Sequence, residues 1–312
     1  MLAIIIPFYK LDFFEDTLLS LSDQTNKKFT VYIGDDASPH DPITLLEKYE
    51  GKINFIYHRF ESNLGSISLT KQWERSIALS NNERWIMLLG DDDVLSNNVV
   101  EEFYNFIQYN KDAELIRFNL KVIDENGKST SKDFNHSVHE TSEILLDQML
   151  LMKETITASE FIFSRDVYNL NHGFVEFPLA WFSDYATWLI YGKNKGIFYI
   201  KRATVYWRLS SNNISSVVSN QKNIQLKINS LFLFLYFLQT NFDIEKKRLK
   251  DYTESQLINF FGNISDFVKI RILRKELLKF KYRSADIIII KFIFERIKRK
   301  KLKNLWKYLF RT

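Results

Sequence analysis

The stretch Trp85-Ile86-Met87-Leu88-Leu89-Gly90-Asp91-Asp92-Asp93-Val94-Leu95 decides how the rest of the chain is interpreted. Its five leading apolar residues are too few for a typical helix and indicate a strand buried on both faces. Three consecutive carboxylates follow; they repel one another and are costly to bury without positive charge nearby. Such hard oxygen ligands suit Mg²⁺ or Mn²⁺ together with substrate phosphates. The alternative is a solvated acidic turn before the next helix.

The composition is that of an ordinary globular protein. The chain has 312 residues, of which 46% are hydrophobic and 26% charged, enough for one large domain or a domain with an appendage. The absence of cysteine excludes disulfides, thiolate metal sites and cysteine nucleophiles, and it fits a reducing compartment. We expect no signal peptide, and the longest apolar runs, 231–238 and 287–290, are far shorter than the roughly 20 residues of a membrane-spanning helix.

Charge is distributed unevenly. The formal net charge is +5, but residues 269–312 contain 16 Lys and Arg against 3 Asp and Glu, so the remainder is acidic. The segment 291–312 has the pattern of a basic amphipathic helix with Phe294 and Trp306, which predicts contact with an anionic membrane surface. A terminal helix packed on its predecessors is the alternative. Nucleic acid is not an expected partner, because the body is acidic and no recognition motif precedes the tail.

Strand and helix patterns alternate in the first part of the chain. Strands are expected at 2–6, 30–33, 53–57 and 85–89, and helices at 12–24, 42–49 and 66–79. This alternation predicts βαβ units and a parallel sheet, in which ligands bind beyond the carboxyl ends of the strands. Three of these ends carry Pro7-Phe8-Tyr9, Asp35-Asp36 and Asp91-Asp92-Asp93, so we expect them to meet on one rim.

The rest of the chain begins with mixed elements and ends in helices. Further helices are expected at 99–109, 141–152, 164–170 and 182–191, and strands at 114–123, 158–163, 196–200 and 204–207. Residues 210–219 have the composition of a loop or lid. From about residue 220 the pattern is helical, with no further strand.

These motifs, in this order, resemble those of the family 2 glycosyltransferases over roughly residues 1–216. The matching pieces are Ile4-Ile5-Ile6-Pro7-Phe8-Tyr9, Leu18 to Gln24, Gly34-Asp35-Asp36-Ala37-Ser38, Asn63-Leu64-Gly65, Asp91-Asp92-Asp93, Phe182-Ser183-Asp184 and Tyr206-Trp207-Arg208 before Asn213-Ile214-Ser215. The resemblance implies the GT-A fold: an α/β, Rossmann-like, mostly parallel sheet with helices on both faces, here with a C-terminal helical extension. The expected domains are a catalytic domain over 1–219, with a nucleotide-binding half (1–123) and an acceptor half (124–219), and a helical, basic, amphipathic region over 220–312.

The resemblance also implies how the donor, a nucleotide-sugar, is held. Pro7 and Tyr9 would line the nucleotide pocket, Asp36 would accept hydrogen bonds from the base, and Asp91 would touch the ribose. Lys71 and Arg208 are candidates to neutralise the diphosphate, together with Arg75, one helical turn from Lys71. Ordinary solvated charges are the alternative for these cations.

A divalent ion, Mg²⁺ or Mn²⁺, is the cofactor that the resemblance implies. Asp92 would bind the ion that bridges the donor diphosphate, and Asp93 would share this role, since the family usually has Asp where Gly90 stands. Lys10 departs from the family, which often has Asn at this place.

Asp184 matches the family's catalytic base, which takes the proton of the attacking hydroxyl in an inverting transfer. A carboxylate in the first turn of a helix is also an ordinary capping group, and this is the alternative. Ser183 stands where a second acid often precedes the base, and no His follows Arg208 where the family frequently has one. Trp181 and Phe182 could stack on an acceptor sugar or pack in the core.

The implied function is metal-dependent, inverting transfer of a sugar to a glycan acceptor, in the bacterial setting a lipid-linked surface polysaccharide. The expected location is cytoplasmic, peripheral on the inner face of the membrane. A sugar nucleotidyltransferase would need a Gly-rich phosphate loop near the N-terminus, and residues 1–20 contain no Gly. A non-catalytic GT-A-fold assembly protein is the other alternative, disfavoured because Asp184 and the triplet are present.

Overall fold

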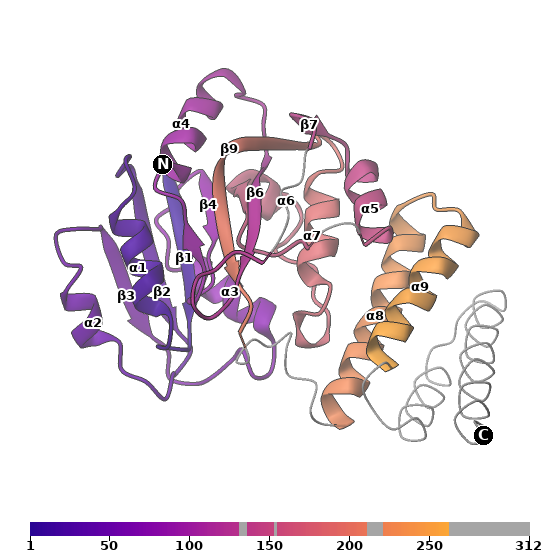
Figure 1. Ribbon diagram of the computed structural model, residues 1–312, viewed down its shortest axis with the longest axis horizontal. Coiled ribbons are helices and arrows are strands. Elements are labelled where there is room, and N and C mark those ends of the chain that lie inside the picture. Colours follow the sequence, from indigo (N-terminus) through magenta and orange to yellow (C-terminus); the bar gives the residue numbers. More distant parts are fainter. Residues whose placement is uncertain (131–135, 153–154, 211–220, 262–312) are drawn as a thin grey trace, which may run out of the picture. The chain divides into compact units, whose positions relative to one another are not determined.

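The computed structural model describes residues 1–130, 136–152, 155–210 and 221–261. The chain divides into two compact units, Met1–Val217 and Val218–Thr312 (Figure 1). The domain boundary predicted at 219/220 lies outside the described residues, as does all of the predicted lid except Ser210. The described strands all belong to the first unit, so the sheet-end residues singled out in the sequence are all found there.

The strands of the described part form one sheet in the order β3-β2-β1-β4-β8-β6-β9-β5, with β7 paired to β9. They are β1 (Leu2–Phe8), β2 (Phe29–Asp35), β3 (Phe55–Arg59), β4 (Trp85–Leu88), β5 (Val94–Leu95), β6 (Leu115–Ile123), β7 (His139–Glu140), β8 (Phe161–Ser164) and β9 (Ile197–Arg208). β3, β2, β1 and β4 run parallel, as the alternation of strands and helices predicts. β8 is antiparallel to both β4 and β6, which the pattern did not predict.

Helices cover the sheet. In the first unit they are α1 (Phe14–Ser22), α2 (Ile43–Glu47), α3 (Leu69–Ile77), α4 (Val99–Tyr109), α5 (Ser142–Leu150), α6 (Arg165–Leu170), the 3₁₀ helix η1 (Pro178–Ala180) and α7 (Ser183–Tyr191). Every residue of β2 and β4 is buried. Continuous burial of successive residues, whose side chains alternate between faces, means that both faces of the sheet are covered.

Several strand boundaries differ from the sequence prediction, and the differences in β1 and β9 have a physical reason. β1 was expected to stop at Pro7 but continues to Phe8, pairing Pro7 with Gly34 and Phe8 with Asp35 of β2. Pro7 is tolerated because its nitrogen lies on the β4 side, where pairing has already ended at Ile5. The two strands expected at 196–200 and 204–207 form the single strand β9, with a register shift opposite Phe118 and Asn119 of β6.

The second unit is helical where it is described. It contains α8 (Gln221–Asn241) and α9 (Lys246–Phe261), whose rings Phe234 and Tyr252 lie edge to face at 6.4 Å. Among the helices of the described part, none is long and apolar enough to cross a membrane. The basic segment 269–312 lies outside the described residues.

Candidate active site

Asp91, just after the carboxyl end of β4, bonds to the loop that follows β1. Its Oδ2 accepts hydrogen bonds from the backbone N–H groups of Tyr9 and Lys10, each at 2.7 Å. Burial, with a smaller contribution from the charge of Asp92, raises the pKa of Asp91 to about 6. The loop after β1 and the loop after β4 are therefore joined through one carboxylate.

Asp93 is the most enclosed carboxylate of the triplet, with 2% of its surface exposed. Its Oδ2 accepts a hydrogen bond from Ser159 Oγ and its Oδ1 one from the backbone N–H of Arg208, at 3.0 Å. Burial and the neighbouring Asp92 charge raise its pKa to about 8. Asp93 therefore ties the triplet to the segment before β8 and to the end of β9.

Asp92 has the side chain most open to solvent in this triplet region. Its Oδ2 lies 3.9 Å from Lys10 Nζ, with side-chain exposures of 13% and 26%. Burial raises the pKa of Asp92, while the positive charges of Lys10 and Arg208 oppose that rise. Asp92 is thus the carboxylate of the triplet that a ligand can reach.

Arg208 is a buried side chain that holds several loops together. Its Nε donates to the backbone carbonyl of Asp92 at 3.0 Å, and one terminal nitrogen donates to the carbonyls of 124–125 at 3.2 Å. The other pairs with Asp16 Oδ2 of α1 at 2.8 Å. The guanidinium also lies over the ring of Phe13, 4.4 Å from its centroid. Its predicted contact with a diphosphate stays a prediction, and in this structure these groups surround the cation.

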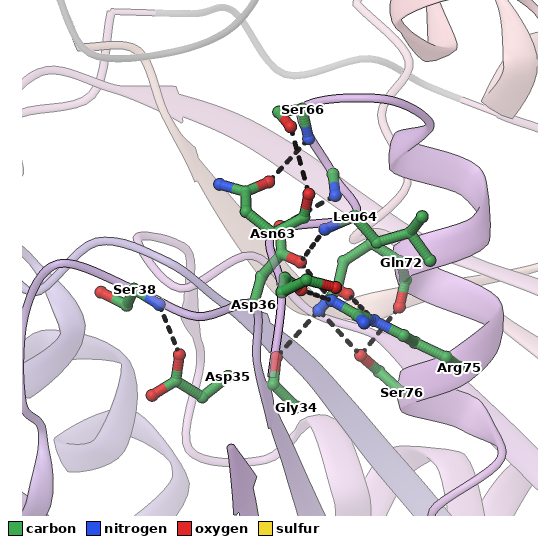
Figure 2. A network of polar contacts seen from close by, with 12 residues as sticks. Gly34, Asp35, Asp36, Ser38, Asn63, Leu64, Ser66, Gln72, Arg75 and Ser76 are labelled. Atoms are coloured by element: carbon green, nitrogen blue, oxygen red, sulfur yellow. Dashed lines mark hydrogen bonds and ion pairs between the residues drawn. The ribbon is translucent and has the colours of Figure 1, made fainter. Parts of the chain in front are cut away.

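Asp36 lies in a network formed by the loop after β2, the loop before α3 and α3 itself (Figure 2). Its carboxylate accepts the backbone N–H groups of Leu64, at 2.7 Å, and Gly65, at 2.9 Å, and pairs with Arg75. A Cβ on Gly65 would lie 2.6 Å from Asp36 Oδ2, so a larger residue at this position would displace the Asp36 carboxylate. Arg75 stacks on Phe60, with its Cζ 3.9 Å from the ring centroid. The network fixes Asp36 at the strand end, where its predicted contact with the base is untested.

The neighbouring carboxylate, Asp35, is fully engaged by hydrogen bonds to other residues of the chain. It accepts hydrogen bonds from the Ser38 N–H at 2.8 Å, from Tyr57 Oη at 2.6 Å and from Arg59 at 2.9 Å. Burial and this hydrogen bond raise the pKa of Tyr57 to about 12. Ser38 Oγ in turn donates to the backbone carbonyl of Tyr9 at 2.7 Å. The β2 end and the β1 end therefore meet on one rim, as expected.

The other residues predicted to contact the nucleotide-sugar donor are at least partly exposed to solvent. Tyr9 is 39% exposed, next to the Asp91 contact, and Pro7 is half-buried in β1. Lys71 is exposed in the first turn of α3, where Ser68 caps the helix by accepting the Lys71 N–H. Arg75 on the same helix instead points to Asp36 (Figure 2).

Asp184 stands in the first turn of α7, after a strained loop. Leu179, Ala180 and Phe182 all have positive φ, at 59°, 50° and 70°, although none is glycine. Side chains with a Cβ adopt this region at a cost, and such strain concentrates at functional sites. Phe182 itself is buried against the rings of Trp181 and Tyr185.

The surroundings of Asp184 favour a base. Asp184 is partly exposed, yet burial, aided by the negative charge of Glu160, raises its pKa to about 7, against the opposing hydrogen bond from the Tyr185 N–H. Glu160 is buried and paired with Arg117 at 3.1 Å. A carboxyl group with a pKa near neutrality is suited to proton transfer.

The segment Thr157–Glu160 connects Asp184 to the triplet. Trp188 of α7 donates its Nε1–H to the Thr157 carbonyl at 3.0 Å, and Ser159 donates to Asp93. Gly90 N–H reaches Ser159 Oγ at 3.3 Å. One short segment thus touches both the helix that carries Asp184 and the loop that carries the carboxylates.

The triplet fits a divalent ion only if other groups, from the substrate or water, supply part of its coordination. In the described part of the chain, no group of three or more His, Asp or Glu side chains is arranged to hold a metal ion. Mg²⁺ often uses one or two carboxylates and completes its coordination with substrate phosphates. Asp92 is reachable, and each Asp93 oxygen retains acceptor capacity beyond the hydrogen bond it accepts. The residues therefore fit an ion whose remaining ligands come from the donor and water.

The comparison with known families decides what kind of protein carries this site. The family described as "Glycosyl transferase family 2" matches residues 3–169, more than half of the chain. The chain belongs to glycosyl transferase family 2. The resemblance inferred from the motifs is therefore confirmed, and this family 2 chain is a glycosyltransferase of mixed α/β architecture.

Solved structures with the same fold include S. aureus TarS. TarS 1–349 in complex with UDP-GlcNAc superposes on this glycosyltransferase with a TM-score of 0.68, at 17% identity, over 96% of this chain and 92% of that chain. TarS 1–349 alone gives 0.61 at 17% identity over 96% and 91%, and its complex with UDP gives 0.57 at 16% identity over the same shares. These likenesses confirm the GT-A fold. No curated protein matches the chain in sequence.

Several residues of this candidate site could not be predicted from the sequence. Ser159, Glu160 and Arg117 belong to no motif quoted above, and their partners lie 43 to 66 residues away in sequence. The sequence indicates Arg75 only as a contact of the diphosphate, and its pairing with Asp36, 39 residues away, has no local signature. Lys10 was visible only as a departure from the family pattern.

Proposed function

We propose that this glycosyltransferase moves a sugar from a nucleotide-sugar donor to a glycan acceptor with inversion, using Asp184 as base. The nucleotide would lie on the rim formed by Pro7, Tyr9 and Asp36, with Asp91 at the ribose. The diphosphate would lie by Asp92, with Lys71 and Arg208 as further candidate contacts. The crystallised complex of TarS with UDP-GlcNAc, of the same fold, supports a nucleotide-sugar as donor.

The observation that carries the proposal is the link between Asp184 and the triplet. Segment 157–160 hydrogen-bonds to α7 through Trp188 and to Asp93 through Ser159, so one segment supports both the helix of the proposed base and the proposed diphosphate site. An inverting transfer needs a base on the acceptor side and charge stabilisation on the leaving-group side. The chain offers a carboxyl group with a pKa of about 7 and a separate acidic loop with a reachable carboxylate.

The chain's own residues account for the remaining steps. Asp184 accepts the proton of the acceptor hydroxyl while the hydroxyl oxygen bonds to the anomeric carbon and the bond to the diphosphate breaks. The closed network around Asp91 and Asp93 holds the loop in one geometry, so little reorganisation is needed during transfer. A divalent ion at Asp92 and Asp93, Mg²⁺ or Mn²⁺, would supply charge stabilisation for the departing diphosphate.

Asp184→Asn is the direct test of the base. The substitution keeps the size and removes the proton acceptor, so we expect kcat to fall about 10²- to 10⁴-fold while donor affinity stays within about twofold. Donor binding is measured by calorimetry and transfer by product formation. Asp166→Asn is the matched control, because Asp166 occupies the same second position of a helix, α6, and is exposed.

The outcomes separate the proposed enzyme from a non-catalytic assembly protein. A wild-type chain that binds nucleotide-sugar but transfers nothing to any glycan acceptor would support the assembly protein. Loss of donor affinity together with transfer in Asp184→Asn would make Asp184 a structural residue.

The acceptor and the location extend the same proposal. A lipid-linked glycan acceptor would be met at the inner membrane surface, and residues 269–312, with 16 basic and 3 acidic side chains, have the charge to bind an anionic surface. A peripheral, cytoplasmic enzyme of bacterial surface-polysaccharide synthesis is the setting that this charge supports.

A further inference from the structure

Lys10 is a cation placed beside the reachable carboxylate of the triplet. Its ammonium lies 3.9 Å from Asp92 Oδ2, at the long end of the range for an ion pair. Both side chains keep access to solvent, at 26% and 13% exposure. The backbone N–H of the same residue donates to Asp91 Oδ2 at 2.7 Å, so the backbone of Lys10 is fixed, and its ammonium lies at the end of a flexible stem.

The other two carboxylates are held by neutral donors instead. Asp91 accepts backbone N–H groups, and Asp93 accepts Ser159 Oγ and the Arg208 N–H. The Arg208 guanidinium bonds to the backbone carbonyl of Asp92 and pairs its charge with Asp16. Within the described residues, Lys10 is therefore the side-chain cation in ion-pair contact with the Asp92 carboxylate.

We propose that the Lys10 ammonium pairs with the Asp92 carboxylate until a divalent ion displaces it, and that the ammonium then pairs with the donor diphosphate. The diphosphate part rests on the proposed function; the competition for Asp92 does not. A pair at 3.9 Å is at the limit of ion-pair contact, and both side chains keep access to solvent, so a divalent ion can replace the ammonium at the carboxylate. Lysine suits this role, since its ammonium is a compact charge on a flexible stem.

The competition is tested first with Mn²⁺ alone. Binding of Mn²⁺ to the full-length protein is titrated by the loss of the free-ion electron paramagnetic resonance signal, without nucleotide. Lys10→Asn and Lys10→Met remove the charge, and we expect both to tighten Mn²⁺ binding at least about fivefold, the fold-change that the interaction of unit charges about 4 Å apart gives in water. Lys10→Arg keeps the charge and should behave like wild type.

Lys28→Asn is the matched control for loss of one surface charge. Lys28 is exposed and directly precedes β2, so it lies at the amino end of the strands, the edge opposite the site. Equal Mn²⁺ affinities for Lys10→Asn, Lys28→Asn and wild type would overturn the proposal, as would the absence of any Mn²⁺ binding to Lys10→Asn.

The second arm measures the affinity for nucleoside diphosphates in EDTA, with a panel of ADP, CDP, GDP and UDP. We expect Lys10→Asn to bind its nucleotide at least about fivefold more weakly than Lys28→Asn when no metal is present. An unchanged affinity would remove the diphosphate role from Lys10 and leave the proposed function intact. If wild type binds no nucleotide with or without Mn²⁺, the proposed function fails, and the Mn²⁺ titration still decides whether Lys10 competes for Asp92.

Discussion

At the scale of single residues, burial raises the pKa of three aspartate carboxyl groups above its ordinary value. Asp91, Asp93 and Asp184 all follow or begin regular elements, yet burial raises their pKa values to about 6, 8 and 7. Asp93 is held by Ser159 and a backbone N–H, whereas Asp184 keeps partial access to solvent. Of these, Asp184 combines a pKa near neutrality with partial exposure to solvent.

The pH dependence of transfer follows from this pKa. As the proposed base, Asp184 can accept a proton only when it is ionised, and with a pKa of about 7 its ionised fraction rises as the pH rises. We expect kcat at saturating donor and acceptor to increase about tenfold per pH unit below pH 7 and to level off above it. Melting curves over the same range check that the protein stays folded. A kcat that is constant from pH 5.5 to 8 would be incompatible with this base.

At the scale of elements, Arg208 joins the end of β9 to α1 and to the loop after β4. Its guanidinium donates to Asp16, to the Asp92 carbonyl and to the turn at 124–125. The sequence points to Arg208 as a diphosphate ligand because it follows Tyr206-Trp207. Its partner Asp16 is 192 residues away, and no local pattern carries such a pairing.

Arg208→Lys measures how much this junction matters. Lysine lacks the planar guanidinium group with its several N–H donors. We therefore expect several hydrogen bonds to be lost and the melting temperature to fall by roughly 4–10 °C. Arg202→Lys, at an exposed position of the same strand, should leave it unchanged. An unaltered melting temperature combined with weaker nucleotide binding would instead make Arg208 chiefly a diphosphate ligand.

Elements also show where prediction from sequence succeeds. The apolar run of β4 and the carboxylates after it are contiguous, so strand, turn and rim position all follow from local pattern. β8 is a short apolar strand, Phe161–Ser164, and nothing in its four residues specifies that it runs antiparallel to β4. Likewise, β9 is one continuous strand because its pairing with β6 continues through a register shift, and this pairing is not visible in the residues of β9 alone.

At the scale of the whole molecule, charge separates the chain into an acidic body and a basic end. Residues 269–312 contain 16 of the 43 Lys and Arg residues. Each basic residue near an anionic bilayer contributes about 1 kcal/mol, so the attraction is additive and sensitive to salt. The alternation of strands and helices predicted the parallel half of the sheet, whereas contacts such as Asp36–Arg75 required the folded chain.

Membrane attachment by this segment is measurable with vesicles. Replacing Lys298, Arg299, Lys300 and Lys301 with Gln removes four charges, and we expect affinity for vesicles containing phosphatidylserine to fall about 10- to 1,000-fold. Sedimentation at low and high salt gives the measurement, with neutral vesicles as the reference. Equal binding of both proteins to anionic vesicles would exclude these four residues as the contact.

The most direct test of donor binding is a thermal-shift panel of ADP, CDP, GDP and UDP, with and without Mn²⁺, on wild type and Asp92→Asn. A ligand that binds only the folded state raises the melting temperature. We expect at least one nucleotide to stabilise the wild type more strongly with Mn²⁺ than without, and that increment to disappear in Asp92→Asn. An absence of any nucleotide-dependent shift in the wild type, or an identical Mn²⁺-dependent shift in both proteins, would contradict a donor diphosphate held at the end of β4.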